Sequence, residues 1–131
     1  MYERKIPEDL ECGIIIAMKV LGGKWKPCII DAIDRGIQRP SELHRAISTA
    51  TPRVLNMQIR ELEESGIISK RIYEEQPLHV KYFLTEAGNS ILAIVHAMDK
   101  WGQENREIYH DSAPVSATRP IKTIHHNFHD H

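Results

Sequence analysis

The 131-residue chain lacks the features that mark several large classes of protein. It has no uninterrupted apolar run long enough to span a bilayer, and no apolar segment near Met1 of the kind found in signal peptides. We therefore expect a cytoplasmic protein with no membrane partner. It also has no Gly-rich phosphate loop, no nucleophile elbow and no internal repeat, so an enzyme is not expected.

Cysteine is scarce, and the two cysteines, Cys12 and Cys28, have neither metal-ligand nor C-x-x-C redox spacing. A helix is expected to begin just after Cys12, where the helix N–H groups and dipole favour a reactive thiolate. Cys12 is therefore a candidate redox-sensing residue. The alternative is an unreactive small residue buried in a dimer. Cys28, on an apolar helix, is expected in the core.

An excess of positive charge is also missing, because the formal net charge is −1. The charge is unevenly distributed, however. Residues 19–81 carry eleven basic and eight acidic side chains, whereas residues 1–18 and 82–131 each carry two more acidic than basic ones. Binding to nucleic acid requires a local basic face rather than a basic protein, so this partner is not excluded.

With 41% hydrophobic and 27% charged residues, the composition is that of one ordinary globular domain. We expect an N-terminal arm over residues 1–11, a folded domain over 12–110 and a flexible tail over 111–131, where apolar periodicity stops. The tail ends in the His-rich segment His125–His131. Since a disordered tail does not pre-organise ligands, no metal site and no cofactor are predicted.

Three apolar patterns predict helices outside the centre of the chain. Residues 13–21 are apolar around almost the whole helix, so we expect burial in the core or in a subunit interface. Residues 24–35 form a second expected helix, with Trp25 and three isoleucines facing inward. A long final helix is expected over residues 85–108, capped by Thr85 and carrying a wide apolar stripe.

The segment from Thr51 to Gly66 is the most informative part of the chain. Thr51 can cap a helix that Pro52 opens and Gly66 ends. Its apolar stripe leaves long hydrogen-bonding side chains on the outer face, which suit base edges and phosphates. The candidate DNA-binding residues on this helix and in the turn before it are Ser48, Thr49, Thr51, Arg53, Asn56, Met57, Gln58 and Arg60.

These side chains have an alternative interpretation as a solvated helix face. Arg60 in particular could pair with glutamates of the same helix, whereas Arg53 lies at the helix N-terminus, where a phosphate is favoured. Glu61, Glu63 and Glu64 make the C-terminal half unsuited to phosphates, so the N-terminal half should read DNA. The lone histidines His44 and His96 are expected to be surface or packing residues.

A β-hairpin is expected directly after this helix. Residues 67–74 and 79–84 are the strands, and an acidic tip between them limits how far the hairpin can press into DNA. Strand alternation places Lys70 and Arg71 on opposite sides, and Arg71 is the favoured contact. The candidate DNA-binding residues of the hairpin are Lys70, Arg71, His79 and Lys81.

A short helix over residues 40–47 precedes these elements. The order helix, turn, helix, hairpin predicts a winged helix-turn-helix, a mainly α fold with a small β-hairpin wing. The predicted function is sequence-specific binding of double-stranded DNA. The alternative is a winged-helix module for protein–protein interaction, which the negative net charge favours.

Several motifs resemble those of the HxlR-type winged helix-turn-helix transcriptional regulators, which are related to the MarR group. The motifs are Leu21-Gly-Gly-Lys-Trp-Lys26, Pro40-Ser-Glu-Leu43, Arg60-Glu-Leu-Glu63, Gly66 and Val80-Lys-Tyr-Phe-Leu-Thr-Glu-Ala-Gly88. The resemblance runs from about Cys12 to Gly102. The chain departs from the family at Pro40, where an aromatic residue is common, and at Gly13, where proline is usual.

The resemblance implies a homodimer that forms through the N- and C-terminal helices and acts on an inverted-repeat operator. It also implies a role as repressor or activator of transcription. Several family members sense oxidants or electrophiles through a cysteine near the place of Cys12. Lys24 and Lys26 belong to the family motif, although they can equally be exposed lysines beside a core tryptophan. No small-molecule effector can be named from the sequence.

Overall fold

The computed structural model describes residues 11–109 of the chain. The chain splits into two compact units between His96 and Ala97. The first contains the helix-turn-helix and the hairpin, and the second contributes described residues 97–109. The predicted N-terminal arm, apart from its last residue, and the predicted tail with its histidines lie outside the described residues.

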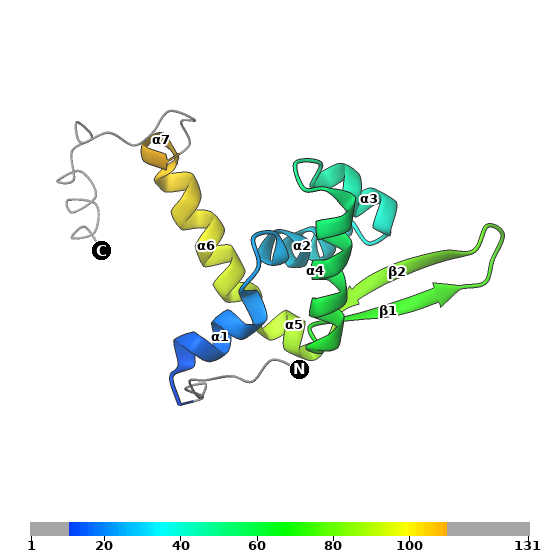
Figure 1. Cartoon of the computed structure of the whole chain (residues 1–131), viewed down its shortest axis with the longest axis horizontal. Helices are drawn as coiled ribbons and strands as arrows, with labels where there is room; N and C mark the ends of the chain where they lie inside the picture. Colours follow the sequence, from blue (N-terminus) through cyan, green and yellow to red (C-terminus); the bar gives the residue numbers. More distant parts are fainter. Residues whose placement is uncertain (1–10, 110–131) are drawn as a thin grey trace. The chain divides into compact units, whose positions relative to one another are not determined.

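The secondary structure is mainly helical with one antiparallel hairpin, as predicted (Figure 1). In chain order the elements are α1 (Gly13–Leu21), α2 (Lys26–Asp34), α3 (Pro40–Ala46), α4 (Pro52–Glu64), β1 (Ile68–Tyr73), β2 (His79–Leu84), α5 (Glu86–Ser90), α6 (Leu92–Glu104) and α7 (Arg106–Tyr109). Among the described helices, none has the length and apolar character needed to cross a membrane.

Helix α4 begins and ends where the sequence predicts. Thr51 Oγ1 accepts a hydrogen bond of 3.2 Å from the Val54 N–H, which satisfies one of the unpaired donors of the first turn. Pro52 is the first helical residue, and Gly66 has a φ of +77°, a conformation that residues with a Cβ rarely adopt. The chain is therefore free to turn from α4 directly into the hairpin.

The core of the first unit lies where α2, α3 and α4 meet the base of the hairpin. The fully or almost fully buried side chains there are Ile29, Ile30, Ile33, Leu43, Leu55, Ile59, Leu62, Ile67 and Ile68. Trp25 is half-buried and packs against this cluster. The predicted inner stripes of α2 and α4 are confirmed, and their burial holds the outer face of α4 toward solvent.

Two hydrogen bonds between Gln38 and Tyr82 connect the hairpin to the helices, a role of Gln38 that the sequence did not indicate. The Tyr82 N–H donates to the Gln38 carbonyl at 2.9 Å, and the Gln38 side-chain amide donates to the Tyr82 carbonyl at 3.1 Å. Gln38 lies between α2 and α3. An isolated hairpin is marginally stable in water, so this link adds to the support that the core provides.

The prediction of one continuous helix over residues 85–108 is wrong, because the structure has three helices there. Thr85 does cap its start, accepting from the Gly88 N–H at 3.1 Å, but a turn at Ile91 separates α5 from α6. There the Ile91 N–H bonds to Gly88, three residues back, in a stretch of poor helix formers. In the second unit, Asn105 separates α6 from α7: the Ile108 N–H bonds to the Asn105 carbonyl, three residues back, and the Asn105 side chain donates to the Trp101 carbonyl at 2.9 Å.

Two predictions about apolar helices also need correction. Helix α1 does not lie in the core of the chain: Ile14 is 75% and Met18 57% exposed, and Leu21 is its buried residue. The interface alternative for this helix remains. Cys28 is exposed rather than buried, because Ile29, Ile30 and Ile33 define the inner face of α2 and Cys28 lies off it.

Candidate nucleic-acid interface

Four predicted residues form one exposed face of α4. Arg53, Asn56, Met57 and Arg60 follow one another at helical spacing and together line a shallow hollow, and we call them the reading face. Within the described residues, neither guanidinium group has a hydrogen bond or ion pair. The alternative interpretation, in which Arg60 pairs with glutamates of its own helix, is therefore not supported in this part of the chain.

Asn56 is held from outside its own helix. His44 Nε2, on α3, lies 2.9 Å from Asn56 Oδ1 across the turn between the two helices. His44 is half-buried and, as a packing residue with a hydrogen-bond partner, contacts a member of the reading face. The contact occupies the amide oxygen of Asn56 and leaves its NH2 group for other partners.

Gln58 lies apart from the other DNA-binding candidates of α4. Its Oε1 accepts a hydrogen bond of 2.9 Å from the Trp25 backbone N–H, and its side chain is half-buried. A Cβ at Gly23 would lie 3.1 Å from the Gln58 amide, tighter than an ordinary contact, so a side chain there would displace this amide slightly. Gln58 therefore connects α4 to the segment before α2 and stands apart from the reading face.

Lys26 does not have the exposed position that was one of its two interpretations. Its side chain is 8% exposed, and Nζ lies 2.9 Å from Glu61 Oε1. Lys24 is the exposed lysine of this motif, with its ammonium 5.0 Å from the Trp25 ring. The Lys26 contact holds the acidic half of α4 against α2, so that the N-terminal half is the part left open to a partner.

The turn before α4 adds short polar side chains to the open end. Ser48 and Thr49 are exposed, and Thr51, although its oxygen caps the helix, is exposed as well and keeps its hydroxyl hydrogen to donate. Arg53 lies in the first turn of α4, where the unpaired backbone N–H groups favour an anion. This end of the helix has the groups that bind phosphate.

Three of the four hairpin candidates lie on one face. Arg71 is directly opposite Lys81 in the β1–β2 register, and Tyr73 is opposite His79, so all four side chains project to the same side. With Phe83 they form what we call the wing face. Arg71 lies 4.5 Å from the Phe83 ring centroid, Lys81 5.4 Å from that of Tyr73, and Tyr73 stacks on His79 at 4.9 Å.

Lys70 is on the opposite side, as the alternation predicts. It is directly opposite Tyr82, on the side that carries the buried Ile68. Burial raises the pKa of the Tyr82 hydroxyl; the Glu63 carboxylate acts in the same direction and Arg60 against it. The charges of Glu63 and Arg60, both on α4, therefore influence a side chain of the hairpin.

Cys12 occupies the N-cap position of α1, as expected for a residue at the helix start. Its side chain is half-buried and makes no capping hydrogen bond. In the part of the chain that the structure describes, no three His, Cys, Asp or Glu side chains gather into a possible metal site. The His-rich segment of the tail lies outside that part.

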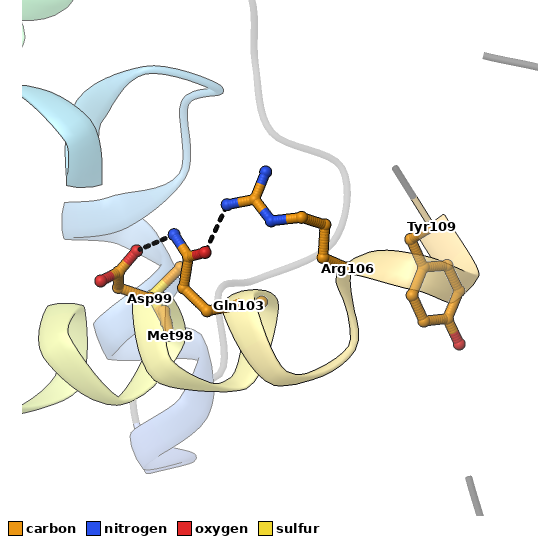
Figure 2. A pocket seen from close by; sticks show the side chains of 6 residues that line it. Met98, Asp99, Gln103, Arg106 and Tyr109 are labelled. Atoms are coloured by element: carbon orange, nitrogen blue, oxygen red, sulfur yellow. Dashed lines mark hydrogen bonds between the residues drawn. The ribbon is translucent and has the colours of Figure 1, made fainter. Parts of the chain in front are cut away.

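A second hollow lies on the second unit, along α6 and α7 (Figure 2). Its polar side chains bind one another: Gln103 donates to Asp99 at 3.3 Å, and Arg106 donates to the Gln103 amide oxygen. Met98 and Tyr109 add apolar surface. None of the predicted site residues lines this hollow, and its mutually bonded groups identify no effector.

The sequence signals missed two parts of this surface. The role of Tyr73 and Phe83 could have been found from the strand alternation, which places them on the side of Arg71. The contact of His44 with Asn56 could not, because the two residues are twelve positions apart and meet only through the angle between α3 and α4.

The chain is similar to known regulators over most of its length. The family model of HxlR-like helix-turn-helix proteins matches residues 20–110. A helix-turn-helix transcriptional regulator of Methanothermobacter thermautotrophicus, itself uncharacterised, is 40% identical over 96 residues, which is 73% of each chain.

Two solved structures share the fold. The redox regulator HypR in its reduced form superposes with a TM-score of 0.69 at 35% identity, over 76% of this chain and 98% of HypR. A protein from Porphyromonas gingivalis W83, assigned to the MarR family of transcriptional regulators, gives a TM-score of 0.69 at 39% identity, over 78% and 99%. The winged helix-turn-helix prediction is thereby confirmed.

Proposed function

Because this chain belongs to the HxlR-like helix-turn-helix family of transcriptional regulators, and not to a family of enzymes, we propose that it binds specific sequences of double-stranded DNA as a cytoplasmic homodimer. Helix α4 enters the major groove with its reading face toward the bases. The wing face lies against the phosphates or the minor groove beside it. The dimer places two such helices on an inverted-repeat operator.

The observation that carries the proposal is the reading face itself. Arg53 and Arg60 are exposed on one side of α4, have no ion pair among the described residues and flank an amide and an apolar side chain. Arginine and amide side chains are the common readers of base edges, and Met57 is suited to a thymine methyl group. If Arg53 and Arg60 served only the fold, we would expect them to be paired with neighbouring carboxylates, as Lys26 is paired with Glu61.

Exposed apolar surface supports the homodimer. On α1, Ile14, Ile16 and Met18 are 75%, 45% and 57% exposed. In the second unit, Met98 and Trp101 are 48% and 52% exposed. Monomeric proteins rarely leave large apolar side chains clustered in water, so each helix needs a cover. A second copy of the chain would supply it.

We further propose that Cys12 makes DNA binding responsive to oxidants or electrophiles. Its support is the position of Cys12 at the N-cap of α1 and the similarity to the redox regulator HypR. A chemical modification of the Cys12 thiol would alter α1, the proposed dimer helix, and through the dimer it would alter how the two reading helices are placed on DNA. Cys12→Ser protein should keep its affinity for the operator when oxidant is added, whereas wild-type and Cys28→Ser protein should lose it.

Selection of bound duplexes from a random pool at low salt tests the main proposal. The expected product is a pair of inverted half-sites with about one helical turn between their centres. Enrichment of a single half-site would contradict the dimeric mode of binding. If no sequence is enriched, the protein–protein interaction module becomes the better account of this winged helix.

A further inference from the structure

We propose that His44 makes the reading face selective for bases that present acceptors and no donor in the major groove, by turning the amide oxygen of Asn56 toward α3 and its NH2 group toward the DNA. The inference rests on the proposed duplex-binding function and adds a specificity determinant to it. His44 acts through Asn56 and is therefore a positioning residue rather than a base contact.

The direction of the hydrogen bond follows from the atoms involved. His44 Nε2 lies 2.9 Å from Asn56 Oδ1, and a carbonyl oxygen can only accept. The ring nitrogen must therefore carry the hydrogen and donate it. Asn56 is exposed, and its NH2 group, with two donors, is left for a partner outside the chain.

The rest of the reading face adds no strong acceptor. Arg53 and Arg60 have only donors, and the thioether of Met57 is at most a weak acceptor. Asn56 Oδ1 is thus the one strong side-chain acceptor among these four residues, and the bond to His44 uses one of its two lone pairs and turns it toward α3. The reading face then consists of donors and one apolar side chain.

Such a surface distinguishes bases by the groups they show in the major groove. Guanine presents two acceptors, and thymine presents one acceptor beside its methyl group, which Met57 can contact. The exocyclic amino groups of adenine and cytosine need an acceptor from the protein. We therefore expect guanine or thymine at the positions that α4 contacts.

Loss of His44 should change the base chosen and not only the affinity. With Oδ1 released, the Asn56 amide can bind adenine through two hydrogen bonds, accepting from N6 and donating to N7. His44→Gln should preserve the wild-type preference, because the glutamine NH2 group can donate to Asn56 Oδ1 in place of the ring.

The experiment selects duplexes from a random pool with wild-type, His44→Ala, His44→Gln and Asn56→Ala protein at one salt concentration. Asn56→Ala should erase a guanine or thymine preference at one position of each half-site. At that position His44→Ala should shift the preference roughly tenfold toward adenine, and His44→Gln should match wild type. Arg45→Ala, which removes a neighbouring exposed cation of α3, is the control and should leave the base preference unchanged.

Failure of the inference and failure of the proposed function give different results. The inference is wrong if His44→Ala weakens all duplexes alike. It is also wrong if wild type prefers adenine at the position that Asn56→Ala affects, or if Asn56→Ala affects no position. In each of these cases wild type still selects a sequence, so the proposed function stands. If wild type selects none, the proposed function fails and the inference fails with it.

Discussion

Lys26 Nζ lies 2.9 Å from Glu61 Oε1, and this ion pair joins the first residue of α2 to the acidic half of α4. The partners are unequally exposed: the lysine side chain is 8% exposed and the glutamate 46%. Together with the hydrogen bond from Trp25 to Gln58, the pair connects the segment after α1 to the reading helix. It gives the Gly-Gly-Lys-Trp motif a structural role.

The two halves of this ion pair should respond differently to substitution. Glu61→Gln leaves a buried ammonium group without its counter-ion and should cost about 1–2 kcal/mol of unfolding free energy, since water still reaches the glutamate side. Lys26→Met keeps the buried stem and leaves an exposed carboxylate, so it should cost less. Urea unfolding measures both, with Glu64→Gln as the control. Equal losses for all three variants would show that the pair contributes nothing.

The pH dependence of stability should include a contribution from Glu42. The backbone N–H of Arg39, followed by that of Gln38 and the nearby guanidinium groups, holds the pKa of Glu42 below its ordinary value of 4.5, while burial opposes this. A depressed pKa stabilises the folded state above the ordinary value, and the stabilisation is lost as pH falls through the folded-state pKa. Wild type should therefore exceed Glu42→Gln in stability at pH 7, and the difference should vanish in acid. A difference independent of pH would exclude this origin.

Gly88 should tolerate no side chain. A Cβ there would lie 2.3 Å from the Ile67 carbonyl oxygen, a backbone atom held by hydrogen bonds from Thr85. Gly88→Ala should thus lower the unfolding free energy by about 1–3 kcal/mol. Gly102 is the matched control, since its Cβ position meets nothing within 4 Å of the chain. In thermal unfolding, a Gly88→Ala protein as stable as Gly102→Ala would contradict the close approach.

The proposed homodimer can be tested on α1. Met18→Glu places a charge on an apolar, 57% exposed position, so it should convert the dimer to a monomer while the helical content of the protein is retained. Analytical ultracentrifugation measures the mass of the particle. Lys19→Glu, which changes the charge at the next position, is the control. Wild type that sediments as a monomer would rule out the dimer directly.

Local signals were sufficient to predict the reading helix. Thr51, Pro52 and Gly66 act through neighbouring backbone groups, and the stripe of Leu55, Ile59 and Leu62 depends on helical period alone. The face opposite a buried stripe follows from the same geometry. For this reason Arg53, Asn56 and Arg60 lie together as the sequence predicts.

The sequence did not reveal positions that tertiary contacts decide. Gln58 and Lys26 are polar residues whose partners belong to other segments, so composition and period could not place them. Cys28, expected in the core because its helix is apolar, is exposed because it lies off the inner face that Ile29, Ile30 and Ile33 form. The break at Ile91 depends on three-residue hydrogen bonds that compete closely with helical ones.

The salt dependence of duplex binding tests the central claim most directly. For the duplex enriched by wild type, Arg53→Ala and Arg71→Ala should each bind more weakly, and each should reduce the slope of log Kd against log salt by about 0.9 per lost phosphate contact. Arg35→Ala removes an equal charge that is already paired with Asp31, and it should leave the slope unchanged. If both test variants keep the affinity and slope of wild type, α4 and the wing are not the surface that binds DNA.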